Sequence, residues 1–360
     1  MLTKKNDPRS SLFPTGSTGL LITFILCSLL STADTFAGDI RVKTGIEVLK
    51  ESGFRMLQRK RVGLITNPTG VDNNLKSTID ILHEAPNVQL VALYGPEHGV
   101  RGDVHAGDKV SDFKDPNTGV PVYSLYGATR KPTKEMLEGV DLLVYDIQDI
   151  GCRSYTYIST LYLAMQAAAE NDIGFVVLDR PNPLGGLKVE GNLVEEGFFS
   201  FVNQLKIPYV YGLTCGELAE MIKGEGMIRR RVDQCRGVCQ GTECGTSSRH
   251  HLSSCPSETL LFRGTGKNYQ GVQIYLTDFN KARLSDIQFH VMEVAARLYP
   301  DHKVFDHAPD NRFDMFDKVC GTDFIRKEFA RNHRFEDISA YWSKDEVPFR
   351  KLSKKYYLYR

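Results

Sequence analysis

Residues 142–151 read LLVYDIQDIG and decide the fold. Leu142 to Asp146 form a nearly continuous apolar run, and polar residues and a glycine follow at once. Similar runs recur along the first half of the chain, at 62–66, 88–94, 175–179 and, more weakly, 120–125. Apolar strands separated by helical patterns are typical of a parallel sheet covered by helices on both faces. The sequence therefore predicts an α/β fold with a Rossmann-like parallel sheet.

The sheet pattern ends near residue 214. It begins at residue 38 and includes a helical pattern over 156–170. Beyond 214 the pattern predicts helices at 215–223, 288–298 and 324–331 and a strand at 271–278. We therefore expect a Rossmann-like catalytic domain over 38–214, followed by a smaller C-terminal α+β domain over 215–360. The segment 228–267 is rich in Arg and Cys, and its lack of apolar periodicity predicts no core element there.

The first 37 residues are typical of a signal peptide. Lys4, Lys5 and Arg9 precede a short apolar run at 20–30, and small residues lead to a cleavage position after Ala37. The run is shorter than a typical membrane-spanning helix, although an uncleaved N-terminal anchor remains the alternative. We expect an exported protein, periplasmic or secreted, with no stable membrane insertion after cleavage.

Composition excludes some classes of function. The chain has 360 residues, 41% of them hydrophobic and 25% charged, enough to bury a core and to exclude intrinsic disorder. Lys and Arg number 45 against 44 Asp and Glu. A net charge of +1 gives no global field for binding nucleic acid, so we expect no nucleic-acid partner.

The cysteines give little support for a metal. Cys152, Cys215 and Cys320 are isolated, and we expect them to be buried as small apolar residues. The other four beyond the signal peptide crowd into 235–255 without the paired spacing of a zinc knuckle, which favours disulfides or a loop. A loop containing His98, Asp103, His105 and Asp108 also matches no standard metal pattern. The sequence predicts no metal site.

Polar and glycine residues follow four of the predicted strands, at 66–70, 95–99, 148–153 and 180–186. Any one of these turns is explained by ordinary turn chemistry. Because the carboxyl ends of parallel strands meet at one edge of a sheet, four such turns favour a single ligand site. The sequence contains no dinucleotide, P-loop, zinc-protease or serine-hydrolase motif. We expect no cofactor.

Glu97 is the strongest catalytic candidate, because it lies in a glycine-bounded turn after an apolar strand. Partial desolvation by Tyr94 and the neighbouring loops would raise its pKa toward neutrality, as a general acid requires. The alternative is a solvated turn glutamate. A second carboxylate near a strand end would complete the pair that glycosidases use. The candidates are Asp146, Asp149, Asp179 and Glu190.

Several stretches together closely resemble the exo-acting β-N-acetylmuramidases, peptidoglycan glycoside hydrolases long classed as a domain of unknown function. They lie at 64–71, 95–102, 145–151, 155–158 and 178–186. The resemblance covers about 42–224 and resumes over 271–360. It implies release of a terminal MurNAc residue from the non-reducing end of cell-wall fragments, with the site between the two domains.

The resemblance places the family's glutamate on Glu97, the residue that the turn chemistry also selects. By position it implies a pocket lined by Asn67, His98, Arg101, Gln148, Asp149, Arg153, Tyr155, Tyr157, Asn182 and Glu190. Asp149 is our choice for the second catalytic carboxylate. One arginine, with Arg101 and Arg153 as candidates, would pair with the lactyl carboxylate that distinguishes MurNAc from GlcNAc.

The segment 228–267 departs from the family, whose members carry a longer Trp- and Pro-rich stretch there, whereas Trp342 is the one Trp of this chain. The leading hypothesis is an exported exo-β-N-acetylmuramidase that acts on MurNAc-containing saccharides. The alternative is a catalytically impaired peptidoglycan-binding or scaffold protein. An ester or amide hydrolase, a third possibility, lacks a nucleophile motif.

Overall fold

The computed structural model describes residues 42–102, 113–228, 274–302, 304–305 and 313–359, together with the backbone of strands at 236–238, 253–258 and 268–273. The expected signal peptide and most of the segment 228–267 lie outside the described residues. Within the described part, no helix is long and apolar enough to cross a membrane.

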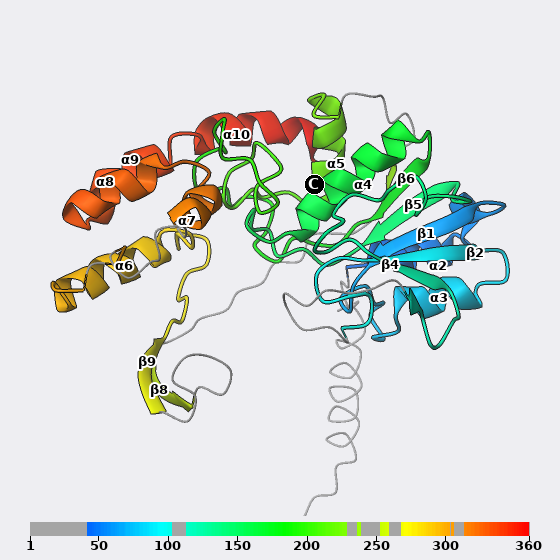
Figure 1. The fold of residues 1–360 in the computed structure, drawn as a ribbon, viewed down its shortest axis with the longest axis horizontal. Coiled ribbons are helices and arrows are strands. Elements are labelled where there is room, and N and C mark those ends of the chain that lie inside the picture. Colours follow the sequence, from blue (N-terminus) through cyan, green and yellow to red (C-terminus); the bar gives the residue numbers. More distant parts are fainter. Residues whose placement is uncertain are drawn as a thin grey trace, which may run out of the picture. The chain divides into compact units, whose positions relative to one another are not determined.

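Within the described residues, seven strands form a mixed and mostly parallel sheet (Figure 1). They are β1 (Arg61–Thr66), β2 (Gln89–Gly95), β3 (Phe113–Lys114), β4 (Pro121–Ser124), β5 (Leu142–Asp146), β6 (Gly174–Leu178) and β7 (Arg236–Val238). Their order is β3-β4-β2-β1-β5-β6-β7, and β3 pairs antiparallel with β4 while the other pairs are parallel. The predicted α/β fold is confirmed. β7 lies in the segment where no core element was expected, so that prediction is wrong at 236–238.

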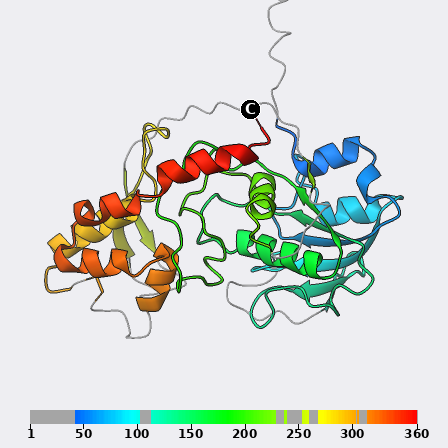
Figure 2. The same cartoon turned by 90° about the horizontal axis from the view of Figure 1, so that it is seen from above.

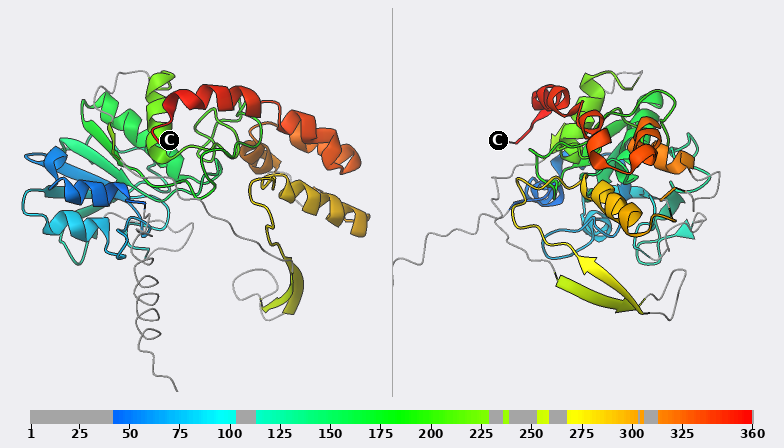
Figure 3. Two further views of the ribbon diagram at one scale, coloured as in Figure 1. Left: turned by 180° about the vertical axis from the view of Figure 1, so that it is seen from behind. Right: turned by 90° about the vertical axis from the view of Figure 1, so that its left-hand side faces the viewer.

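Helices cover both faces of this sheet, as Figure 3 shows from behind. They are α2 (Gly45–Glu51) and α3 (Thr78–Glu84) on one face, with α4 (Tyr157–Glu170) and α5 (Cys215–Gly224) on the other. Along β5, Leu143 and Tyr145 pack in the core with α4 and α5, while Leu142 and Val144 pack in the core with α2 and α3. Each fully buried Leu or Val contributes roughly 1.5–3 kcal/mol. Burial on both faces explains why β5 is apolar throughout.

The order in which the chain adds strands to the sheet reverses at β1. From β1 it proceeds outward through β2 to β4, and then returns to place β5 on the other side of β1. Ligands of open α/β sheets bind at such a switch point, beyond the carboxyl ends of the strands. The turns after β1 and β5, which contain Asn67 and Asp149, therefore flank the expected ligand crevice.

The start of α5 is fixed by a capping box. Thr214 Oγ1 accepts from the Glu217 backbone N–H at 3.2 Å, and the Glu217 carboxylate accepts from the Thr214 N–H at 3.0 Å. The buried face of α5, including Leu218 and Ile222, packs in the same core as α4. The domain boundary at residue 214 stays a prediction.

The C-terminal part is mainly helical, and its helices α6 to α9 pack together as one group (Figure 2). The remaining elements are η1 (Arg55–Leu57), β8 (Ser253–Glu258), β9 (Asn268–Gln273), α6 (Ile287–Leu298), α7 (Phe313–Cys320), α8 (Phe324–Asn332), α9 (Phe335–Trp342), α10 (Glu346–Ser353) and η2 (Lys354–Tyr356). Trp342 is fully buried, meets the Phe289 ring edge-on at 5.0 Å, and donates to Ser285 Oγ at 3.0 Å. The predicted helices at 288–298 and 324–331 are confirmed. The predicted strand at 271–278 is wrong beyond Gln273, where β9 ends.

Candidate active site

Glu97 lies in a tight turn directly after β2. The Gly99 N–H donates to the Pro96 carbonyl at 3.0 Å and closes the turn. His98 is half-buried and adopts a left-handed conformation, with a φ of 73°. That conformation costs a residue with a side chain roughly 1–3 kcal/mol and is concentrated at functional sites. The backbone here is arranged to present Glu97 and His98 at the sheet edge.

Two hydroxyl groups contact the half-buried Glu97 carboxylate. Its Oε2 lies 3.4 Å from Oγ1 of Thr156, the N-cap residue of α4. The Tyr126 hydroxyl hydrogen-bonds to Glu97, and burial together with this carboxylate raises the pKa of Tyr126. Burial raises the pKa of Tyr157, and the negative charges of Glu97 and Asp149 raise it further. Glu97 therefore lies where the segments after β2 and β4 meet the start of α4.

Asp149 is buried, and its two carboxylate oxygens have different surroundings. Oδ2 accepts from the Gly151 N–H at 2.7 Å and from the Tyr211 hydroxyl. Oδ1 has no hydrogen-bond partner among the described residues. Burial raises the pKa of Asp149 to about 6, although the two hydrogen bonds oppose the rise. Asp149 thus has one carboxylate oxygen that is buried and has no partner in the described part of the chain.

The other candidates for the second carboxylate are fully engaged. Asp146 is buried and accepts from Nε and Nη2 of Arg180 at 2.6 and 3.0 Å. Asp179 accepts at 2.8 Å from the Gly216 backbone N–H at the start of α5, and also from the Thr214 hydroxyl. Glu190 accepts at 2.7 Å from a backbone N–H close before α6. Among these four carboxylates, Asp149 alone retains an oxygen without a partner in the described part of the chain.

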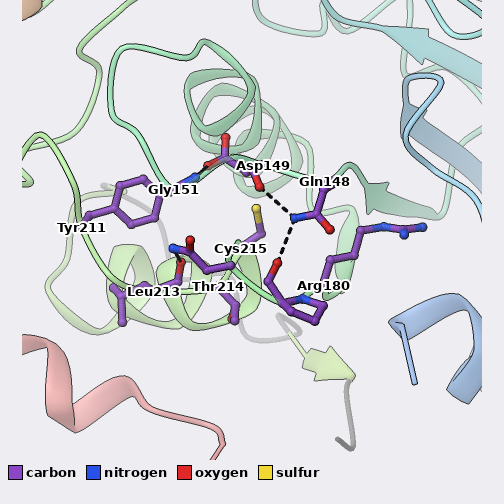
Figure 4. A pocket seen from close by; sticks show the side chains of 10 residues that line it. Gln148, Asp149, Gly151, Arg180, Tyr211, Leu213, Thr214 and Cys215 are labelled. Atoms are coloured by element: carbon purple, nitrogen blue, oxygen red, sulfur yellow. Dashed lines mark hydrogen bonds between the residues drawn. The ribbon is translucent and has the colours of Figure 1, made fainter. Parts of the chain in front are cut away.

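A narrow crevice, too tight to hold a water molecule, lies beside Asp149 (Figure 4). It is lined by Gln148, Asp149, Gly151, Arg180, Pro181, Asn182, Tyr211, Leu213, Thr214 and Cys215. Gly151 has a φ of 81°, and a Cβ there would come within 2.3 Å of Asn182 Oδ1, so this position requires glycine. The crevice collects three of the predicted site residues, Gln148, Asp149 and Asn182.

Several predicted substrate-binding residues already hydrogen-bond within the protein. Gln148 Nε2 donates to the carbonyls of Asp149 and Pro181, both at 2.8 Å. Asn182 donates to one backbone carbonyl and accepts from one backbone N–H, each at 2.9 Å. Asn67 Oδ1 accepts from the N–H of Thr69 at 3.0 Å. These side chains fix the turns that shape the site.

The two tyrosines of the predicted site lie at the start of α4. Asn67 also hydrogen-bonds to the Tyr157 hydroxyl, which links the turn after β1 to this helix. Tyr155 lies close enough to Tyr157 to affect its pKa, and 50% of Tyr155 is exposed. An exposed aromatic ring next to Thr156, which contacts Glu97, offers a flat apolar surface for a sugar ring.

Arg153 is buried and bonds to backbone carbonyls. Nη1 donates to Asn192 and Ile207 at 2.7 and 2.6 Å, and Nη2 donates to Val319 and Cys320 at 3.1 and 3.0 Å. Burial lowers the pKa of Arg153 to about 10. The guanidinium holds the end of α7 to the loops that follow β6, so its outer N–H groups are not available to a substrate carboxylate.

Arg101 is also committed to protein partners. Its Nε lies 2.6 Å from an Asp115 oxygen, and its Nη2 lies 2.8 Å from an Asp80 oxygen. These two carboxylates raise the pKa of Arg101. Neither arginine that the sequence favoured for binding a carboxylate has a free guanidinium edge in this structure.

Sequence reasoning missed Tyr126, Thr156 and Tyr211 as partners of the two candidate carboxylates. Tyr126 comes two residues after β4, the weakest of the predicted strands. A signal for it was present, because a polar, glycine-containing turn follows that strand as it follows the other four. Thr156 and Tyr211 gave no comparable signal in the sequence.

Cys152, Cys215 and Cys320 are free and buried, as predicted. Asp103, His105, Asp108 and the side chains of the clustered cysteines lie outside the described residues. Within the described part, no group of three or more His, Cys, Asp or Glu side chains is arranged to hold a metal ion.

The raised pKa of Asp149 predicts a pH dependence of stability. Its folded-state pKa is about 6 against a usual 3.8, so the folded protein binds this proton more tightly than the unfolded chain does. The free energy of unfolding of the wild type, relative to that of Asp149→Asn, should therefore fall as pH rises from about 4 to about 6. The fall should approach about 3 kcal/mol. Urea unfolding of both proteins across this range measures it, and a constant or rising difference would contradict the assignment.

Comparison with known proteins identifies the family of this chain. Residues 62–241 and 257–359 match the family models for the N-terminal and C-terminal parts of exo-β-N-acetylmuramidase NamZ. The chain is 38% identical to the peptidoglycan β-N-acetylmuramidase NamZ of Bacillus subtilis (strain 168) over 384 residues, which cover 89% of this chain and 92% of that protein.

Crystal structures of two DUF1343 family proteins from Bacteroides fragilis NCTC 9343 share the fold. The first has a TM-score of 0.82 and 49% identity, covering 89% of this chain and 100% of its own. The second has a TM-score of 0.67 and 27% identity, covering 89% and 99%. The resemblance seen in the sequence is thereby confirmed, and the chain belongs to the exo-β-N-acetylmuramidase NamZ family.

Proposed function

We propose that this protein is an exo-β-N-acetylmuramidase, a glycoside hydrolase that releases terminal MurNAc from the non-reducing end of peptidoglycan fragments. The observation that carries the proposal is the position of Glu97, at the carboxyl edge of the sheet in a chain of this family. Hydroxyl groups from two segments of the chain, the loop after β4 and the start of α4, contact its carboxylate there.

In the proposed mechanism Glu97 is the general acid. Its protonated carboxyl group donates the proton to the glycosidic oxygen as the bond to C1 of MurNAc breaks. The hydroxyls of Tyr126 and Thr156 hold the carboxyl group in position. The exposed ring of Tyr155 supports one face of the sugar.

Asp149 is the proposed second carboxylate. Its free Oδ1 either attacks C1 or accepts the proton of an attacking water, the two roles that distinguish retaining from inverting glycosidases. Both roles require the ionised form, so activity should rise as pH passes through about 6. Asp149 and Glu97 both raise the pKa of Tyr157, so both carboxylates lie near this tyrosine.

We further propose that the protein is exported to the periplasm or secreted. The basic start, the short apolar run and the small residues of 1–37 support export, and peptidoglycan lies outside the cytoplasmic membrane. The N-terminal sequence of the mature protein tests this, because cleavage should leave Gly38 as the first residue.

Product analysis tests the reaction. The protein should release free MurNAc from MurNAc-GlcNAc, and from longer glycan strands it should release this single sugar without internal fragments. A folded protein that binds these saccharides without releasing MurNAc would favour a peptidoglycan-binding protein instead. Release of acyl or amide products without a new reducing sugar would favour the ester or amide hydrolase.

A further inference from the structure

The loop after β4 carries an exposed arginine, Arg130, and begins beside the turn that contains Glu97. The Leu125 N–H donates to the Gly95 carbonyl at 2.8 Å, so this loop begins beside the turn that contains Glu97. Tyr126 comes next and hydrogen-bonds to Glu97. Arg130, four residues further, lies close enough to Tyr126 for its positive charge to oppose the rise in the pKa of Tyr126.

The Arg130 guanidinium is oriented but not neutralised. Its central carbon lies 4.4 Å from the centre of the Phe201 ring, which is buried, while the Arg130 side chain is exposed. Stacking on an aromatic ring fixes the guanidinium plane and leaves its N–H edges available. Among the described residues, no Asp or Glu forms an ion pair with Arg130, in contrast to Arg101.

We propose that Arg130 binds the lactyl carboxylate of the terminal MurNAc residue and thereby selects MurNAc over GlcNAc. The proposal rests on the proposed function of the same site. The lactyl group is attached to C3 of the sugar whose C1 carries the scissile bond. Arg130 belongs to the loop whose Tyr126 hydrogen-bonds to Glu97, so a sugar held at Glu97 would lie beside this loop.

The chemistry of the two groups is complementary. A guanidinium offers two parallel N–H donors that match the two oxygens of a carboxylate, and such charge-assisted pairs are stronger than neutral hydrogen bonds. GlcNAc has a hydroxyl group at C3 and offers no such partner. Arg130 would then be the residue that recognises the group distinguishing the two sugars, the role that sequence reasoning assigned to Arg101 or Arg153.

Kinetics of Arg130→Gln test the proposal with two chromogenic substrates, a MurNAc glycoside and its lactyl methyl ester, which is neutral. The variant should lose roughly 10- to 100-fold in kcat/KM on the MurNAc glycoside and less than about threefold on the ester. Arg130→Lys, which keeps the charge but loses the paired donors, should lie between wild type and Arg130→Gln. Lys134→Gln removes a positive charge from an exposed position nearby and should behave as wild type.

Three results would overturn the proposal. Equal losses on both substrates would make Arg130 a positioning residue for Tyr126 or its loop. An unchanged rate on both would place the lactyl carboxylate elsewhere. If the wild type turns over neither substrate, the proposed function fails, and the role of Arg130 is tested on its own. Calorimetry then compares the binding of free MurNAc with that of free GlcNAc. A wild-type preference for MurNAc that Arg130→Gln removes would then support the role of Arg130, and equal binding of both sugars would overturn it.

Discussion

Glu97→Gln is expected to lower the release of MurNAc from MurNAc-GlcNAc by roughly 10²- to 10⁴-fold, the usual contribution of a general acid. Glutamine keeps the size of the side chain and can still accept from Thr156 and Tyr126, so the turn should fold unchanged. An amide cannot supply the proton that the leaving sugar oxygen needs. The loss should therefore appear mainly in kcat.

The leaving group gives this experiment an internal control. Nitrophenolate departs with little need for a proton, whereas the sugar oxygen of GlcNAc departs as an alkoxide unless it is protonated. The loss in Glu97→Gln should thus be much smaller on nitrophenyl-MurNAc than on the disaccharide. A loss of the same size on both substrates would show that Glu97 positions the sugar, and a loss below threefold on the disaccharide would exclude it as the acid.

A matched substitution excludes a general effect of losing a carboxylate. Glu138 is exposed and lies between β4 and β5, and no carboxylate contact of Glu138 is found in the described part of the chain. Glu138→Gln should retain wild-type rates on both substrates. Equal melting temperatures for both variants and the wild type would confirm that the fold is unchanged.

The sheet could be predicted because its strands are buried on both faces. β1, β5 and β6 are nearly continuous apolar runs, since helices cover each side of them. β4 lies next to the short edge strand β3 and is buried at alternate positions only, so its run is weaker. For that reason the sequence did not predict Tyr126 and Arg130, which follow β4, as site residues.

The roles of the arginines could not be predicted, because their partners are distant in sequence. Arg153 donates to the carbonyl of Cys320, 167 residues away, and Arg101 pairs with Asp80 and Asp115 from different parts of the sheet domain. A sequence shows that an arginine follows a strand end, but it does not show which groups bond to the guanidinium in the folded protein. Burial and tertiary contacts decide whether such a group binds substrate or the protein itself.

Asp146→Ala is expected to lower the free energy of unfolding by about 3–5 kcal/mol, as when one partner of a buried ion pair is removed. Asp146 is fully buried at the end of β5, and the side chain of Arg180 is 6% exposed. Without the carboxylate, this guanidinium remains buried with its charge uncompensated. Urea unfolding measures the loss. Because Arg180 also lines the crevice beside Asp149, MurNAc release should fall as well.

Asp141→Ala provides the matched control for Asp146→Ala. Asp141 directly precedes β5, which ends at Asp146, and it also pairs with an arginine. Nη2 of Arg61 lies 2.9 Å from Oδ1 of Asp141, but the two side chains are 49% and 33% exposed. Water and salt screen such a pair, so its loss should cost a small fraction of the Asp146 effect and should shrink further at high salt. The Asp146 effect should change little with salt, because that pair is almost completely buried. Equal losses, or equal sensitivity to salt, would show that the Asp146–Arg180 pair does not stabilise the carboxyl edge of the sheet as a buried pair should.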